Sequence, residues 1–288
     1  MTKAKVLVLG SNGQLGSDLV EVLDREIELI KFTRRDFDAE RDTIEKLPAN
    51  VDYIINCISY HKTDECEDYP DKSFKVNSSF VYELAKFCQK NNITLFHIST
   101  DYVFDGAKEN PYKEEDEPNP LNVYGLSKFA GEKAVQNYMD KFFIFRVSSL
   151  FGRVGASGKG GNFVETMIRL AKNGTPLKVV ADQYMTPTHT LDIARAIRQF
   201  IINNIKDYGI YHCCNSGSCS WYEFTKKIFE LANIYYPVSK TTYEEYKTKA
   251  RRPKYSVLDN SKISKYYKMK KWEDALVEYL KIKGYVKA

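Results

Sequence analysis

The sequence predicts an α/β fold: a doubly wound parallel sheet of the Rossmann type, interleaved with a smaller C-terminal substrate domain. Short apolar runs alternate with helical segments along the chain, which is typical of a parallel sheet covered by helices. The first apolar run leads directly into a glycine-rich turn and then a helix, as in dinucleotide-binding folds. With 288 residues and 43% hydrophobic content, the chain can bury the core of one large domain or of two modest ones.

Composition and charge exclude several classes of function. The net charge of +5 is mild and the basic residues are scattered, so we expect no nucleic-acid partner. No apolar run approaches the roughly 18 residues of a membrane helix, and the N-terminus enters a strand without signal-peptide features. The six cysteines show no C-x-x-C spacing and there are only four histidines, so zinc and disulfides are not expected. We therefore expect a cytoplasmic protein with reduced thiols.

The first strand, Lys5–Leu9, is followed by the turn Gly10-Ser-Asn-Gly-Gln-Leu-Gly16. Gly10 permits the tight turn, Gly13 lets the backbone approach a pyrophosphate, and Gly16 lets the following helix pack closely on the strand. The pyrophosphate would lie at the positive end of that helix. We predict that this turn, Asn12 included, binds a dinucleotide.

The second strand, Glu28–Phe32, runs into Thr33-Arg34-Arg35. An acidic residue at this position would hold the ribose hydroxyl of NAD, whereas two cations suit a 2′-phosphate. We therefore expect Thr33 and Arg34 to contact the cofactor and NADPH to be preferred. Asp36 and Asp38 follow closely, so the sequence leaves NADH open.

The middle of the chain continues the alternation. Val51–Cys57 is an expected strand, Phe74–Asn91 a helix and Thr94–Ser99 a strand. Thr100, Asp101 and Tyr102 follow that strand, at the edge of the sheet where such folds bind ligands. The remaining expected elements are a loop at Phe104–Asn122, a helix at Val123–Met139, a strand at Lys141–Val147, a glycine-rich loop at Ser157–Gly161, helices at Asn162–Asn173, Thr190–Asn203, Ser220–Ala232 and Trp272–Lys281, and strands at Leu177–Val180 and Ile210–Cys214.

Tyr124 and Lys128 lie four residues apart in the expected helix, so their side chains share one face. A tyrosine titrates near pH 10 and is a poor acid at neutral pH. A cation one helical turn away favours the phenolate and lowers that pKa. The pair predicts a general acid that protonates a carbonyl oxygen while a hydride reaches the carbon.

We expect two regions. Residues 1–148 would form the dinucleotide-binding domain, with 188–212 returning to it. Residues 149–187 and 213–288 would bind the substrate, because they lack the spacing of a further nucleotide-binding half.

The chain resembles the extended short-chain dehydrogenase/reductase superfamily and, more closely, the dTDP-4-dehydrorhamnose reductase family. The resemblance covers nearly the whole chain. Its carriers are Gly10–Gly16, His97–Gly106, Pro120–Lys128, Gly131–Lys133, Asn162–Phe163, Asp182–Gln183, Pro187–Thr188, Ser220–Tyr222 and Arg252–Pro253.

The resemblance implies roles at the matching positions. Gly13, Gln14 and Leu15 would line the cofactor diphosphate, Asp38 and Ala39 would lie near the adenine, and Cys57, Ile58 and Ser59 would lie along the middle of the cofactor. Thr100, Tyr124 and Lys128 would form a catalytic triad. The substrate would contact Thr100, Asp101, Tyr102, Ser149 and Arg252, with Arg252 near its diphosphate.

Two features concern the sugar and the assembly. The family often has a Trp where this chain has Ser149, so another side chain such as Phe151, Tyr184 or Tyr102 would have to complete the sugar pocket. Some members form a metal-bridged dimer through acidic residues, and Asp18 matches one such position. The other positions have no clear match, so we predict no metal and leave a homodimer open.

The leading hypothesis is NADPH-dependent reduction of a nucleotide-linked 4-keto-6-deoxyhexose, foremost dTDP-4-dehydro-6-deoxy-L-mannose to dTDP-L-rhamnose. One alternative is a nucleotide-sugar epimerase or dehydratase with tightly bound NAD. The other is a non-catalytic NADP-binding regulatory subunit, which could retain the same three residues.

Overall fold

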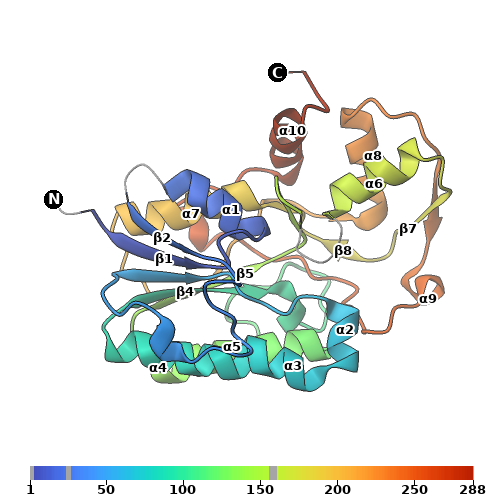
Figure 1. Ribbon diagram of the computed structural model, residues 1–288. Helices are drawn as coiled ribbons and strands as arrows, with labels where there is room; N and C mark the ends of the chain where they lie inside the picture. Colours follow the sequence, from blue (N-terminus) through green and yellow to red (C-terminus); the bar gives the residue numbers. More distant parts are fainter. Residues whose placement is uncertain (1–2, 24–26, 156–160, 288) are drawn as a thin grey trace.

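The computed structural model describes residues 3–23, 27–155 and 161–287 (Figure 1). The predicted loop at Ser157–Gly161 lies outside these residues except for Gly161. A six-stranded sheet forms the centre, and all its neighbouring strands are parallel. In spatial order its strands are β10 (Gly209–His212), β5 (Phe142–Val147), β4 (Thr94–Thr100), β3 (Tyr53–Asn56), β1 (Lys5–Leu9) and β2 (Glu28–Phe32). The predicted doubly wound α/β fold is therefore confirmed.

Helices cover both faces of this sheet because its strands are apolar on both sides. Val6 and Val8 of β1 point to the face covered by α1 (Gln14–Leu23) and α7 (Thr190–Ile202). Leu7 and Leu9 point to the opposite face, covered by α4 (Phe80–Lys90) and α5 (Val123–Tyr138). Figure 1 shows these two helical layers above and below the sheet.

A third core lies beside the sheet, at the upper right of Figure 1. It is built from α6 (Phe163–Lys172), α8 (Trp221–Leu231) and α10 (Trp272–Ile282). Short strand pairs accompany it: β6 (Leu150–Phe151) with β9 (Thr188–His189), β7 (Leu177–Val180) with β12 (Val238–Thr241), and β8 (Tyr184–Met185) with β11 (Cys219–Ser220).

The predicted helix Phe74–Asn91 is helical in the structure, but it is not one regular α-helix. The structure has α2 (Thr63–Asp68), α3 (Pro70–Phe74), a π-helical turn at Lys75–Ser79 and then α4. The wider turn carries Asn77, whose amide binds both backbone groups of Tyr60 at 2.9 and 3.0 Å. The irregular turn thus occurs where Asn77 binds the loop at Tyr60. No local sequence pattern reveals this contact.

A further short helix, α9, spans Tyr243–Tyr246. Single 3₁₀ turns occur at Ile44–Lys46, Asp101–Val103 and Ile263–Lys265. No helix among the described residues is long and apolar enough to cross a membrane.

Candidate active site

A cavity of about 580 Å³ opens at the carboxyl ends of the central strands. It gathers nearly all the residues predicted from the sequence, namely Gly10, Asn12, Gly13, Gln14, Leu15, Arg34, Asp38, Ala39, Cys57, Ile58, Ser59, Thr100, Asp101, Tyr102, Tyr124, Lys128, Ser149 and Arg252. Thr33 does not line the cavity. Its hydroxyl donates to Asp36 Oδ2 at 2.7 Å instead.

The glycine turn at one end of the cavity has the shape that a dinucleotide needs. Gly10 has a φ of +76°, and its amide donates to Phe32 O at 2.9 Å, which closes the turn against β2. A Cβ added to Gly16 would lie 2.1 Å from Gly10 O, so only glycine fits there. Gln14 Nε2 is buried in this wall without a hydrogen-bond partner among the described residues. The unpaired donor and the start of α1 fit a bound diphosphate.

The charge at the end of β2 differs from the prediction. Arg34 binds Asp38 at 3.2 Å and Glu40 at 2.5 Å, so two carboxylates already compensate its guanidinium. Arg35 is exposed and does not line the cavity. Only one of the two expected cations therefore borders the site, and a 2′-phosphate would have to share it with Asp38 and Glu40.

Tyr124 is the second residue of α5, whose N-terminus is capped by the side chain of Asn122. Burial raises the pKa of Tyr124 to about 12, and the Asp101 carboxylate adds to this, while hydrogen bonds with the Thr100 and Ser59 side chains oppose it. The expected lowering of the pKa by Lys128 is absent here. The phenol is protonated throughout the neutral range, which is the state of a proton donor.

Lys128 is turned toward the sheet and not toward Tyr124. Its side chain is fully buried, and its Nζ donates to Ile98 O at 2.7 Å and faces His97 Nε2 at 3.5 Å. Burial lowers the pKa of Lys128 to about 8, and Glu132 opposes this shift. Sequence spacing placed both side chains on one face of α5, but the hydrogen bond to the Ile98 carbonyl determines where the ammonium points.

The low pKa of Lys128 predicts an alkaline limit to activity. Because this pKa of about 8 lies below the usual lysine value, most of the ammonium is present at pH 7, half of it at pH 8, and it is lost as the pH rises further. We expect kcat/KM to fall above pH 8, approaching tenfold per pH unit. Steady-state rates across the alkaline range measure this. The Lys128→Met variant should be slow at every pH, and its kcat/KM should not fall at alkaline pH. A wild-type kcat/KM that stays constant up to pH 9.5 would contradict the role given to the Lys128 ammonium.

Thr100 and Asp101 form a buried pair in the wall of the cavity. Thr100 Oγ1 donates to Asp101 Oδ1 at 3.1 Å, and Ser148 Oγ donates to Asp101 Oδ2 at 3.0 Å. Burial raises the pKa of Asp101 to about 6, although these hydroxyls and Ser256 oppose the shift. Ser149 follows with a φ of +45° and lines the cavity. The threonine hydroxyl is thus fixed within hydrogen-bonding reach of Tyr124.

Four aromatic side chains form one wall of the cavity, called here the aromatic wall. It consists of Phe151, Phe163, Trp221 and Phe224. Phe163 packs against Trp221 at a tilt, with ring centroids 4.6 Å apart, and stacks on Phe224 with centroids 5.6 Å apart. Our sequence reasoning did not predict Phe163, Trp221 or Phe224 as cavity residues. The capping box that Ser220 forms at the start of α8 is the local signal that places Trp221 there. Of the three side chains considered for the sugar pocket, Phe151 and Tyr102 line the cavity, whereas Tyr184 does not.

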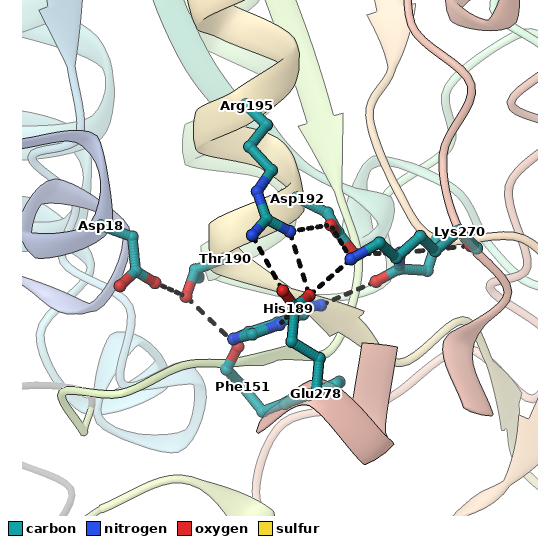
Figure 2. Close-up of polar contacts among 9 residues, drawn as sticks. Asp18, Phe151, His189, Thr190, Asp192, Arg195, Lys270 and Glu278 are labelled. Carbon is teal, nitrogen blue, oxygen red and sulfur yellow. Dashed lines mark hydrogen bonds and ion pairs between the residues drawn. The ribbon is translucent and has the colours of Figure 1, made fainter. Parts of the chain in front are cut away.

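A second polar cluster lies between α1, α7 and α10 (Figure 2). Among the described residues, His189, Asp192 and Glu278 are the group close enough to hold a metal ion. Arg195 binds Glu278 at 2.8 Å and Asp192 at 3.2 Å, and Lys270 binds Glu278 at 2.6 Å. These two cations already neutralise both carboxylates, so the cluster does not fit a divalent ion.

Asp18 lies in the same region, and its carboxyl group also has a hydrogen-bond partner within the chain. It is 2% exposed and accepts a hydrogen bond from Thr190 Oγ1 at 2.5 Å. Burial raises its pKa. A carboxyl group enclosed in this way cannot reach a second chain.

The cluster therefore predicts that divalent metals are not required. Activity after EDTA treatment and dialysis should stay within about 20% of the untreated protein, because the ion pairs of Arg195 and Lys270 stabilise the cluster. Adding Mg²⁺ should restore nothing. A loss of activity that Mg²⁺ reverses would contradict this account of the cluster.

Comparisons with known proteins are consistent with this geometry. The family model described as "RmlD substrate binding domain" matches residues 4–284. The chain is 36% identical to the spore coat polysaccharide biosynthesis protein SpsK of Bacillus subtilis, with 96% of both chains covered. It is 37% identical to the dTDP-4-dehydrorhamnose reductase of Aggregatibacter actinomycetemcomitans, over 95% of this chain and 97% of that protein.

A solved structure agrees equally well. The crystal structure of dTDP-4-dehydrorhamnose reductase from Bacillus anthracis in complex with NADP matches with a TM-score of 0.89 and 37% identity. The match covers 97% of this chain and 99% of that one. Both the nucleotide-binding and the aromatic parts of the cavity therefore fall within the matched region.

Proposed function

The chain belongs to the dTDP-4-dehydrorhamnose reductase family, and we propose that it reduces a nucleotide-linked 4-keto-6-deoxyhexose with NADPH. The observation that carries this proposal is the shared cavity. The glycine turn, Tyr124 and Thr100, and Arg252 with the aromatic wall all line one cavity. A dinucleotide and a nucleotide sugar would meet at the tyrosine.

In the proposed mechanism the protein holds the ketone and supplies the proton. When the ketone binds, the Thr100 hydroxyl turns its single proton from Asp101 Oδ1 to the carbonyl oxygen and polarises it. The Tyr124 hydroxyl gives its proton to that oxygen. The buried Lys128 ammonium keeps positive charge beside the reacting groups. NADPH, when bound along the glycine turn, supplies the hydride.

The substrate we favour is dTDP-4-dehydro-6-deoxy-L-mannose, which would be reduced to dTDP-L-rhamnose. Arg252 can pair with a diphosphate, and the aromatic wall offers the apolar surface that Ser149 does not provide. A screen of dTDP-, CDP-, GDP- and UDP-linked 4-keto sugars tests this choice, with the loss of NADPH absorbance as the measure of activity. The dTDP sugar should give the highest kcat/KM, and a higher value with another base would replace it.

Cofactor choice is tested at Arg34. We expect a higher kcat/KM with NADPH than with NADH, because Arg34 can turn from Asp38 and Glu40 to a 2′-phosphate. Changing Arg34 and Arg35 to Asp should remove the preference by weakening NADPH use, while the NADH value changes little. Arg35→Asp alone is the matched control and should do little. A wild type that already prefers NADH would contradict the role given to Arg34. Homodimer formation and a cytoplasmic location stay predictions.

A further inference from the structure

The short helix α2 carries three carboxylates on one face, Asp64, Glu67 and Asp68. Each carboxylate contacts a part of the chain that is distant in sequence. Asp64 and Asp68 bind the segment Lys249–Arg252, which is more than 180 residues away, through Arg252 and Lys249 respectively. Glu67 accepts a hydrogen bond from the Val123 amide at 2.9 Å. The helix therefore lies between the segment that carries Arg252 and the start of α5.

Arg252 is fixed from several directions. Its NH2 binds Asp64 Oδ2 at 2.7 Å, its NH1 donates to Ala250 O at 3.3 Å, and its backbone amide donates to the Tyr243 hydroxyl at 2.9 Å. The other Asp64 oxygen accepts the Ala250 amide at 2.9 Å. The Asp64 carboxylate thus binds the side chain of Arg252 and the backbone two residues before it.

The guanidinium keeps free donors despite these bonds. An arginine has five N–H groups. The bonds to Asp64 and Ala250 use two of them, and a hydrogen bond to the Tyr102 hydroxyl uses a third. Arg252 lines the cavity next to Tyr102, and its side chain is only 19% exposed. The remaining donors are available to an anion in the cavity.

The segment that carries Arg252 also contacts α5, the helix that carries Tyr124. Asn122, which caps α5, donates through Nδ2 to Arg251 O at 2.7 Å. Its Oδ1 accepts the Gly125 amide at 2.7 Å. Tyr124 therefore lies within the capped first turn, and Arg252 is one residue from the carbonyl that Asn122 binds.

We propose that Asp64 is a positioning residue for substrate: it holds the Arg252 guanidinium at the cavity wall, ready for the diphosphate of the nucleotide sugar. The inference rests on the proposed function. A long side chain that is already ordered loses less freedom when the phosphates bind. The opposite role, in which Asp64 competes with the phosphates, would require the pair to separate on binding. The donors that Asp64 leaves free make such a separation unnecessary.

The test is Asp64→Asn, which keeps the shape of the side chain and removes its charge. We expect the KM for the dTDP-linked keto sugar and the Kd for dTDP, measured by calorimetry, to rise about tenfold. The kcat and the Kd for NADPH should stay within twofold. Asp68→Asn is the matched control, because its partner Lys249 is half-exposed and does not line the cavity, and it should change each value by less than twofold.

A double-mutant cycle separates positioning from a general structural effect. In an Arg252→Ala background, Asp64→Asn should add less than twofold to either constant. A fall in KM, an unchanged Kd for dTDP, or an equal loss of NADPH binding would overturn the inference. Should no keto sugar oxidise NADPH, the proposed function fails, but the dTDP measurement still decides whether Asp64 positions Arg252.

Discussion

Replacing Tyr124 by Phe is expected to lower turnover by about 10²–10⁴-fold, the usual scale for a lost general acid. The substitution removes only the hydroxyl that contacts Thr100 and Ser59. The ring would stay half-buried against Tyr102, with ring centroids 6.1 Å apart, so the fold and the cavity should be retained. Single-turnover rates with saturating NADPH measure the loss, and the Kd for NADPH should change by less than twofold.

Tyr138→Phe is the matched control, because Tyr138 is the last residue of α5 and is 44% exposed. It should leave turnover unchanged. Activity of Tyr124→Phe within threefold of wild type would show that no proton passes through this hydroxyl. Absence of turnover in the wild-type chain with every keto sugar tested would instead favour a non-catalytic NADP-binding subunit.

The central sheet was predictable from sequence because its strands bury both faces. The runs at Lys5–Leu9 and Glu28–Phe32 have the predicted ends, and the other four predicted strands differ by two residues or fewer at either end. The glycine turn was equally clear, since steric contact at Gly16 excludes any other residue. Such features depend on local geometry and therefore leave a local pattern.

Two of the features that were missed depend on contacts between separate segments. The position of Lys128 is determined by Ile98 O, and the π-helical turn accompanies the bonds between Asn77 and Tyr60. The pairing of Arg34 with Asp38 and Glu40 is local, and it was missed because the sequence does not specify which way the guanidinium turns. Helix α2 carries too few apolar residues to show helical periodicity. The division into residues 1–148 with 188–212, and 149–187 with 213–288, stays a prediction.

Below the cavity, Glu132 and Arg146 form an ion pair that sequence reasoning also missed. Arg146 Nε donates to Glu132 Oε1 at 3.0 Å and NH2 donates to Oε2 at 2.7 Å. The Ser99 hydroxyl donates to the same carboxylate. The two side chains are 2% and 0% exposed. A pair enclosed so completely is costly to break, because the remaining charge cannot reach water.

Glu132→Gln is therefore expected to lower the free energy of unfolding by about 3–5 kcal/mol, because it leaves the Arg146 charge buried without a counter-charge. Urea unfolding measures this. The control is Glu230→Gln in the exposed Lys227–Glu230 pair, which should cost less than about 1 kcal/mol.

Glu132 also opposes the lowering of the Lys128 pKa, so its loss should move the alkaline limb of kcat/KM to lower pH. Replacing both partners, Glu132→Leu with Arg146→Met, should recover much of the stability. An unfolding free energy for Glu132→Gln no lower than that of the control would show that Arg146 finds another partner when the carboxylate is removed.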